Sequence, residues 1–171
     1  CPKQIVKLSK QTKAKLEVNL FYANQKRKNA IIKTLKNNGA REILGTNHKT
    51  STKLPGIDSD RRIVDKNGIF AADVVVVPLE DGDRTIALRK AGKKVITFDL
   101  NPLSRTSQTA NITIVDNVTR AIDLLIDESK KLSKKNINVL QKIVDEFDNK
   151  KNLTENVIQI KNNLTRRARI A

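Results

Sequence analysis

The chain is poor in several residue types, and each shortage excludes a class of protein. Its single cysteine, Cys1, allows no internal disulfide, and with one histidine, His48, it has no cluster of the kind that binds zinc. Six glycines and four prolines among 171 residues exclude a collagen-like or low-complexity chain. The longest apolar stretch, around Val74–Val77, is far shorter than the roughly 18 to 20 residues of a membrane helix. We therefore expect a soluble protein of a reducing compartment, the cytoplasm.

Methionine is absent altogether, and the chain opens on Cys-Pro-Lys-Gln without the apolar core of a signal peptide. A translated chain begins with methionine unless it is trimmed, so we expect an internal fragment of a longer protein. With 38% hydrophobic and 30% charged residues, the chain can bury a core. A length of 171 residues suits one domain, since domains usually hold roughly 100 to 200 residues.

Acidic residues are too few to balance the basic ones, and the net charge is +16. Residues 1–50 carry 12 basic and 2 acidic groups, whereas residues 51–150 carry 17 and 15, and residues 151–171 carry 5 and 1. A nucleic-acid surface normally pairs basic side chains with aromatic ones for base stacking, but aromatic residues are only 3%. We therefore interpret the basic excess as a solvated face that helps to gather anionic substrates.

The hydrophobic pattern predicts an α/β fold: a Rossmann-like open parallel sheet flanked by helices, with further C-terminal helices. Strands are expected at 16–22, 43–44, 72–78, 94–99 and 112–115, and helices at 24–39, 86–91, 118–132, 137–147 and 153–170. The four-valine run Val74–Val77 is typical of a strand buried on both faces. Residues 45–67 show no period and are expected to form a long loop. We predict one α/β nucleotide-binding domain over 1–171, with residues 136–171 as closing helices of the same domain.

Polar residues follow three of the predicted strands. The clusters are Glu80, Asp81, Asp83 and Arg84; Asp99, Ser104 and Arg105; and Asp116 and Asn117. Because ligands of open parallel sheets bind outside the carboxyl ends of the strands, we expect all three clusters to converge on one edge.

Two of these clusters have both a ligand-binding and a structural interpretation. Asp81 and Asp83 could hold Mg²⁺ beside phosphates, or could complement the dipole of a following helix. Asp99 could bind ribose hydroxyls, or could cap the turn at 101–102. Ser104 and Arg105 suit phosphate oxygens, although an arginine in a loop is often only solvated.

The third cluster is equally open, because Asp116 and Asn117 could contact a ligand or cap the helix that begins at Val118. The chain contains neither G-x-G-x-x-G nor G-x-x-x-x-G-K-[ST], which excludes the standard dinucleotide and Walker motifs. From the residues alone, the sequence predicts a nucleotide or phosphate ligand on an α/β sheet.

Longer sequence segments resemble a known family. They are AKLEVNLFY at 14–22, KLPGI at 53–57, ADVVVVPLEDGDRT at 72–85, DLNPLSR at 99–105 and ITIVDN at 112–117. Together they closely resemble the archaeal 4-phosphopantoate–β-alanine ligase, or phosphopantothenate synthetase, family from about residue 2 to about residue 164.

The resemblance implies an ATP-dependent, AMP-forming ligase that joins 4-phosphopantoate to β-alanine in coenzyme A biosynthesis. It implies ATP and Mg²⁺ as cofactors, a homodimer, and no nucleic-acid or membrane partner. The nucleotide-binding residues would be Phe98, Asp99, Leu100, Ser104, Arg105, Asp116 and Asn117. The catalytic candidates are Arg105, Asp81, Asp83 and Arg84. Of these, Asp81, Asp83 and Arg84, together with Glu80, are candidates for contacts to a metal ion or to the acid substrate. No residue is assigned as a ligand of a resident metal. A nucleotide-binding regulatory module and a nucleic-acid-binding basic protein stand as alternatives.

One feature of the resembled family is missing. Its members carry an N-terminal helical region, with Arg and Gly-Arg-Gly positions that contribute to the ATP site and to dimer packing. This chain begins just upstream of the predicted first strand at residue 16. We therefore expect the 171-residue chain alone to be weakly active or inactive.

Overall fold

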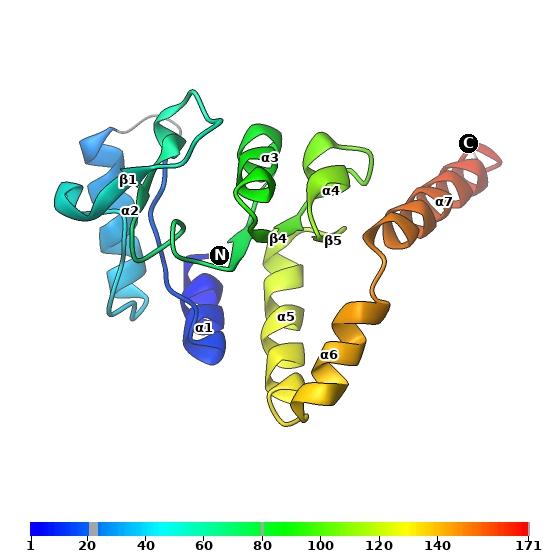
Figure 1. Ribbon diagram of the computed structural model, residues 1–171. Coiled ribbons are helices and arrows are strands. Elements are labelled where there is room, and N and C mark those ends of the chain that lie inside the picture. The colour runs from blue at the N-terminus through cyan, green and yellow to red at the C-terminus, as the bar shows by residue number, and fades with distance from the viewer. Residues whose placement is uncertain (21–23, 80, 171) are drawn as a thin grey trace.

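A three-stranded parallel sheet lies at the centre of the protein (Figure 1). The computed structural model describes residues 1–20, 24–79 and 81–170. The strands are β3 (Val74–Val77), β4 (Lys94–Phe98) and β5 (Ile112–Ile114), in the order β3-β4-β5. Val75 lies opposite Val95, and Ile96 lies opposite Ile112. The predicted open parallel sheet flanked by helices is confirmed.

Each face of the sheet packs against its own helices. On one face, α3 (Gly82–Lys90) contributes Leu88 to a core with strand residues such as Val77 and Val95. On the other face, α5 (Val118–Leu132) packs Ile122 and Ile126 against Phe98, with the short α1 (Pro2–Thr12) beside it. Figure 1 shows α3 and α4 (Arg105–Thr109) on the side of the sheet opposite to α5. This sandwich leaves the carboxyl ends of the strands at a common edge.

The valine run is not buried on both faces, contrary to the prediction. Val75 and Val77 are buried in the core below α3, but Val74 is 53% exposed and Val76 is 37% exposed. β3 is an outer strand of the sheet, and the α1–α5 layer packs on Phe98 of β4 and Ile114 of β5. A run of valines does not distinguish the centre of a sheet from its edge, because valine suits strands in both places.

The helix predicted after Asn24 is confirmed as α2 (Gln25–Asn37). The Asn24 side chain accepts a hydrogen bond from the Arg27 backbone N–H at 3.2 Å, and Gly39 follows the helix with a φ of 88°. The strands predicted at 16–22 and 43–44 are reduced to one parallel bridge between Glu17 and Leu44. Residues 21 and 22 lie outside the described residues.

The predicted loop at 45–67 is wrong, because it contains an antiparallel pair. Its strands are β1 (Ser51–Lys53) and β2 (Ile63–Asp65), with the 3-10 turns η1 (His48–Thr50) and η2 (Asp60–Arg62) before each. Strands of three residues are too short to show a period in the sequence. The pair is anchored by burial of Val64 and of Leu54, which join the core below α3.

The C-terminal helices are α6 (Ile137–Glu146) and α7 (Asn149–Ala168). The predicted second helix began at 153, but α7 begins four residues earlier because the Asp148 side chain accepts hydrogen bonds from the N–H groups of Lys150 and Lys151. Figure 1 shows α7 extending away from the sheet, with the C-terminus at its far end. Among the described residues, no helix is long and apolar enough to cross a membrane.

Candidate functional site

The three polar clusters lie at the ends of neighbouring parallel strands, as predicted. The turn after β3 leads into α3, the turn after β4 into α4, and the turn after β5 into α5. Glu80, which belongs to the first cluster, lies outside the described residues. The remaining residues of the three clusters therefore share one edge of the sheet.

The first turn of α3 is organised by Asp81. One carboxylate oxygen of Asp81 accepts the Arg84 backbone N–H at 3.3 Å and so caps the helix, and the other pairs with the Arg61 guanidinium. The Asp81 N–H donates to the Thr106 hydroxyl at 3.1 Å, which links the starts of α3 and α4. These contacts match the interpretation in which Asp81 stabilises the start of the following helix. Sequence reasoning missed Arg61, since it lies in the segment predicted as a loop.

Arg84 places a guanidinium at the same turn. Its side chain is half-buried, and desolvation lowers its pKa, while the charges of Asp81 and Glu17 oppose that shift and the charge of Arg61 adds to it. An arginine keeps its charge in spite of such a shift. In the described part of the chain, Arg84 has no ion-pair partner within 4.0 Å, because Asp81 is paired with Arg61. The turn therefore holds two guanidinium groups around one carboxylate.

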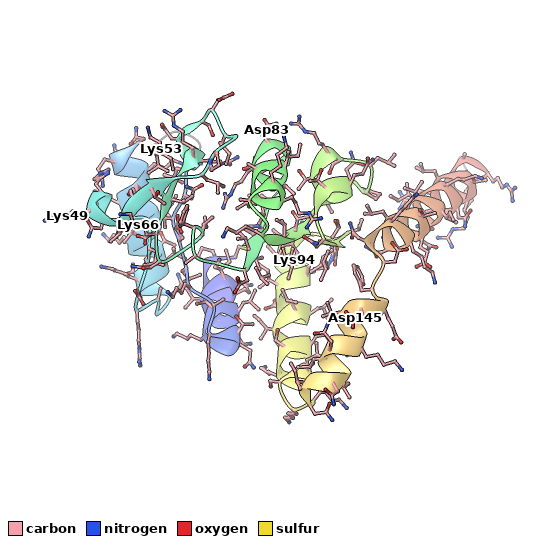
Figure 2. The ribbon with its side chains drawn as sticks, viewed as in Figure 1. Lys49, Lys53, Lys66, Asp83, Lys94 and Asp145 are labelled. Atoms are coloured by element: carbon pink, nitrogen blue, oxygen red, sulfur yellow. The ribbon has the colours of Figure 1, made fainter. Side chains whose placement is uncertain are left out.

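The N-terminus of α3 also lies against Arg105. A Cβ added to Gly82 would lie 2.6 Å from Arg105 Nε, so only glycine allows the guanidinium to approach this closely. Arg105 pairs with Asp83 at 2.9 Å, and both side chains are mostly exposed. Figure 2 shows Asp83 at one end of α3. Exposed ion pairs contribute about 0 to 1 kcal/mol, so little free energy prevents either group from turning to a ligand.

Asp99 and Ser104 form a hydrogen-bonded turn after β4. The Asp99 carboxylate accepts the Asn101 N–H at 2.9 Å and the Ser104 hydroxyl, while Ser104 Oγ accepts the Ser107 N–H at 3.0 Å as the N-cap of α4. These contacts match the second interpretation of Asp99, in which its carboxylate caps the turn at 101–102. A ribose hydroxyl would have to share or replace the Ser104 hydroxyl at that carboxylate.

The two residues that flank Asp99 differ in their exposure. Phe98 is 3% exposed and packs in the core below α5, so it can offer a ligand little more than its backbone. Leu100 is 67% exposed at the edge of the sheet. Of the two residues predicted to lie beside adenine, Leu100 is therefore the one with side-chain surface available.

Asp116 and Asn117 stabilise the start of α5. The Asn117 side chain accepts the Thr119 N–H at 3.0 Å, which makes it the N-cap. Asp116 accepts the Asn117 N–H at 2.6 Å and pairs with Arg120, and the hydrogen bond from Arg120 lowers the Asp116 pKa. Asn117 thus caps α5, as one of its two interpretations predicted. Nucleotide binding by Asp116 and Asn117 stays a prediction.

The described carboxylates that follow β3 at this edge are paired with arginines rather than gathered into one cluster. Over residues 1–20, 24–79 and 81–170, no three His, Cys, Asp or Glu side chains gather as metal ligands would. Asp81 is paired with Arg61, and Asp83 is paired with Arg105.

The chain matches one protein family and is similar to curated ligases of archaea. Residues 1–163 match the family described as phosphopantothenate/pantothenate synthetase. The chain is 46% identical over 168 residues to a 4-phosphopantoate–beta-alanine ligase of Thermococcus kodakarensis, covering 98% of this chain and 64% of the relative. It is 47% identical over 163 residues to the enzyme of that name from Methanosarcina mazei, covering 95% of this chain and 63% of the relative.

The chain thus spans about 64% of the length of the curated relatives that it matches. The similarity includes all three strand ends at the polar edge of the sheet. This chain belongs to the phosphopantothenate/pantothenate synthetase family.

Proposed function

We propose that the protein condenses 4-phosphopantoate with β-alanine to form 4′-phosphopantothenate, an ATP-dependent, AMP-forming step of coenzyme A biosynthesis. The observation that carries this proposal is the 46–47% identity, over nearly the whole chain, to relatives named for that reaction. The polar edge of the sheet supports it, because it brings arginine and helix N-termini together where anionic substrates could bind.

The proposed chemistry has two steps. A carboxylate oxygen of 4-phosphopantoate attacks the α-phosphorus of ATP and pyrophosphate leaves; the amine of β-alanine then attacks the acyl carbon and AMP leaves. Both steps depend on positioning and on neutralising negative charge rather than on a nucleophilic side chain. The scarcity of cysteine and histidine in the chain is therefore no obstacle to either step.

We assign the ATP phosphates to Arg105 and Ser104, and the nucleoside to the ends of β4 and β5. Arg105 is suited to this role because its only ion pair among the described residues is an exposed one with Asp83. On this proposal Asp99, Asp116 and Asn117 hold the turns in shape and contact the nucleoside. On this proposal Mg²⁺ would bind together with ATP and neutralise part of the charge of its phosphates.

The proposal includes a homodimer in the cytoplasm. Exposed apolar side chains on α6 and α7 support an assembly, because Val144 is 62% exposed, Ile158 is 51% exposed and Leu164 is 63% exposed. The basic side chains would attract the anionic substrates to the surface. Lys49, Lys53 and Lys66 lie together on the part of the molecule that holds β1 (Figure 2).

The decisive experiment measures AMP release by the full-length gene product. We expect AMP to form only when ATP, 4-phosphopantoate and β-alanine are all present. ATP binding without substrate-dependent AMP release would instead indicate a regulatory module, and steeply salt-dependent affinity for DNA or RNA would indicate a nucleic-acid-binding protein. Either result would overturn the proposal. The 171-residue chain, assayed in parallel, tests the expectation that it is weakly active or inactive alone.

A further inference from the structure

Two arginines from different segments lie at the start of α3. Arg61 reaches it from η2 and pairs with Asp81, while Arg84 lies in the first turn of α3. The charge of Arg61 is close enough to lower the pKa of Arg84. Two arginines are thus held near each other at one end of the sheet edge.

Two described carboxylates, Asp81 and Glu17, lie near Arg84, and both are already used in other contacts. Asp81 uses its oxygens for Arg61 and for the Arg84 backbone N–H. Glu17, the next carboxylate, accepts the backbone N–H groups of Asp65 at 2.9 Å and Ile69 at 2.7 Å. Burial raises the Glu17 pKa, which weakens its role as a counter-ion. Within the described residues, the Arg84 guanidinium therefore has no carboxylate in direct contact.

Two residues next to Arg61 and Arg84 each carry a buried polar atom without a hydrogen-bond partner among the described residues: Asn19 Oδ1 and Thr85 Oγ1. Asn19 is held in place by bonds from its amide nitrogen to the carbonyl oxygens of Arg61, at 3.1 Å, and Ile63, at 2.7 Å. Thr85 is fully buried and follows Arg84 directly. An unpaired buried polar group costs about 1 to 3 kcal/mol, so folded proteins retain few of them, and functional sites are one place where they do.

We propose that Arg61 and Arg84 bind the phosphate group of the acid substrate, 4-phosphopantoate. This inference rests on the proposed function and assigns one group of that substrate. A guanidinium matches the oxygens of a phosphate through paired hydrogen bonds. Asp81 holds Arg61 in position. Arg84 supplies a positive charge that no described carboxylate contacts directly.

The position on the sheet explains why the ligand is the acid substrate rather than ATP. Arg61 and Arg84 lie at the β3 end of the polar edge, whereas the predicted nucleotide residues follow β4 and β5. Arg105, one of these nucleotide residues, lies against Gly82 at the N-terminus of α3. A phosphate held at β3 leaves the carboxylate of the same substrate free to extend toward the α-phosphorus of ATP.

The test is a kinetic comparison in the full-length protein of Arg84→Gln and Arg61→Gln with Arg89→Gln. Arg89 is an exposed arginine of the same helix and serves as the matched control. We expect at least a tenfold higher KM for 4-phosphopantoate in the first two variants, with the KM for ATP and β-alanine changed by less than twofold. The control should retain wild-type constants.

A second measurement replaces 4-phosphopantoate by pantoate, which lacks the phosphate. The wild type should prefer the phosphorylated substrate, measured as the ratio of kcat/KM for 4-phosphopantoate to kcat/KM for pantoate. This ratio should fall at least tenfold in Arg84→Gln and recover in part in Arg84→Lys. Loss of preference is a ratio between substrates, so reduced folding of a variant does not imitate it. An unchanged ratio, or an equal rise in the KM for ATP, would overturn the inference.

Failure of the proposed function gives a different result. A wild-type protein that forms no AMP contradicts the proposed function, whereas an active enzyme whose substrate preference ignores Arg61 and Arg84 contradicts only this inference. If no AMP forms, calorimetric titration with 4-phosphopantoate decides the inference. Binding that Arg84→Gln weakens tenfold supports it, and binding equal in wild type and variant refutes it.

Discussion

The side chain of Asn149 joins α7 to the sheet, and its removal should cost a large part of the stability of the protein. Asn149 Oδ1 accepts the backbone N–H of Thr113 in β5 at 2.8 Å. Its amide nitrogen donates to the carbonyl oxygens of Ser107 at 3.0 Å and Ala110 at 3.2 Å. Asn149 thus pairs the Thr113 N–H on the outer side of β5, where the described sheet has no neighbouring strand, and ties α7 to the turn before β5.

The magnitude follows from these three bonds. A buried hydrogen bond contributes about 1 kcal/mol net, so Asn149→Ala should lose about 3 kcal/mol. The higher helix propensity of alanine returns about 0.5 kcal/mol. We expect a net loss of roughly 2 to 3 kcal/mol, which is a substantial share of the 5 to 15 kcal/mol that stabilises a typical domain.

Urea denaturation of Asn149→Ala measures this loss, and Asn163→Ala is the matched control. Asn163 is an exposed residue of the same helix, so its replacement should change the free energy of unfolding by less than about 0.5 kcal/mol. Hydrogen exchange at the Thr113 amide should accelerate in Asn149→Ala alone. If the two variants are equally stable, or if exchange at Thr113 does not change, the hydrogen bonds of Asn149 do not anchor α7.

Two further changes test how the chain around β1 and β2 is held. Burial alone would raise the pKa of Asp65, but hydrogen bonds, chiefly from the Thr50 hydroxyl at 2.6 Å, lower it overall. Because the folded-state pKa is lowered, the stabilisation exists above the ordinary aspartate pKa of about 3.9 and is lost as pH falls through the folded value. Thr50→Val should therefore cost roughly 1.5 to 3 kcal/mol in urea titrations at pH 7 and less below about pH 4; a loss that does not depend on pH would contradict this reasoning. Gly68→Ala places a Cβ 2.1 Å from Glu17 Oε2, so it should displace Glu17 and cost about 2 kcal/mol or more in the same titrations. Gly92→Ala is the control, because its Cβ meets open space at a φ of 78°, and it should cost about 1 kcal/mol from backbone strain alone. Equal losses in the two glycine variants would show that Glu17 adjusts freely.

Local chemistry made much of the fold predictable. Asn24 and Gly39 delimit α2 because a side-chain oxygen and a left-handed glycine satisfy helix ends without help from distant residues. The strands β4 and β5 were predictable as short apolar runs between turn residues. Parallel strands alternating with helices then require the three polar turns to share an edge.

Other elements depend on distant partners and could not be predicted in this way. β1 and β2 form from segments of three residues each, and burial of Leu54 and Val64 in the core with α3 helps to hold them. Glu17 lies in an alternating pattern typical of a strand, yet it forms a single bridge and binds the backbone of residues 65 and 69. The half-exposed Val74 shows the same limit, since exposure depends on which strand is at the edge.

The sequence by itself determined the fold class, the sheet edge that gathers the three polar turns and the resemblance to phosphopantothenate synthetases, because these depend on local patterns and on similar segments. Only the tertiary structure decided which groups meet there. It placed Arg61 beside Arg84 although 23 positions separate them, and Arg105 over Gly82. It also showed that Asp81, Ser104 and Asn117 cap helices. Electrostatic contacts fall off with distance in space rather than along the chain, so the composition of a charged site follows from the folded arrangement.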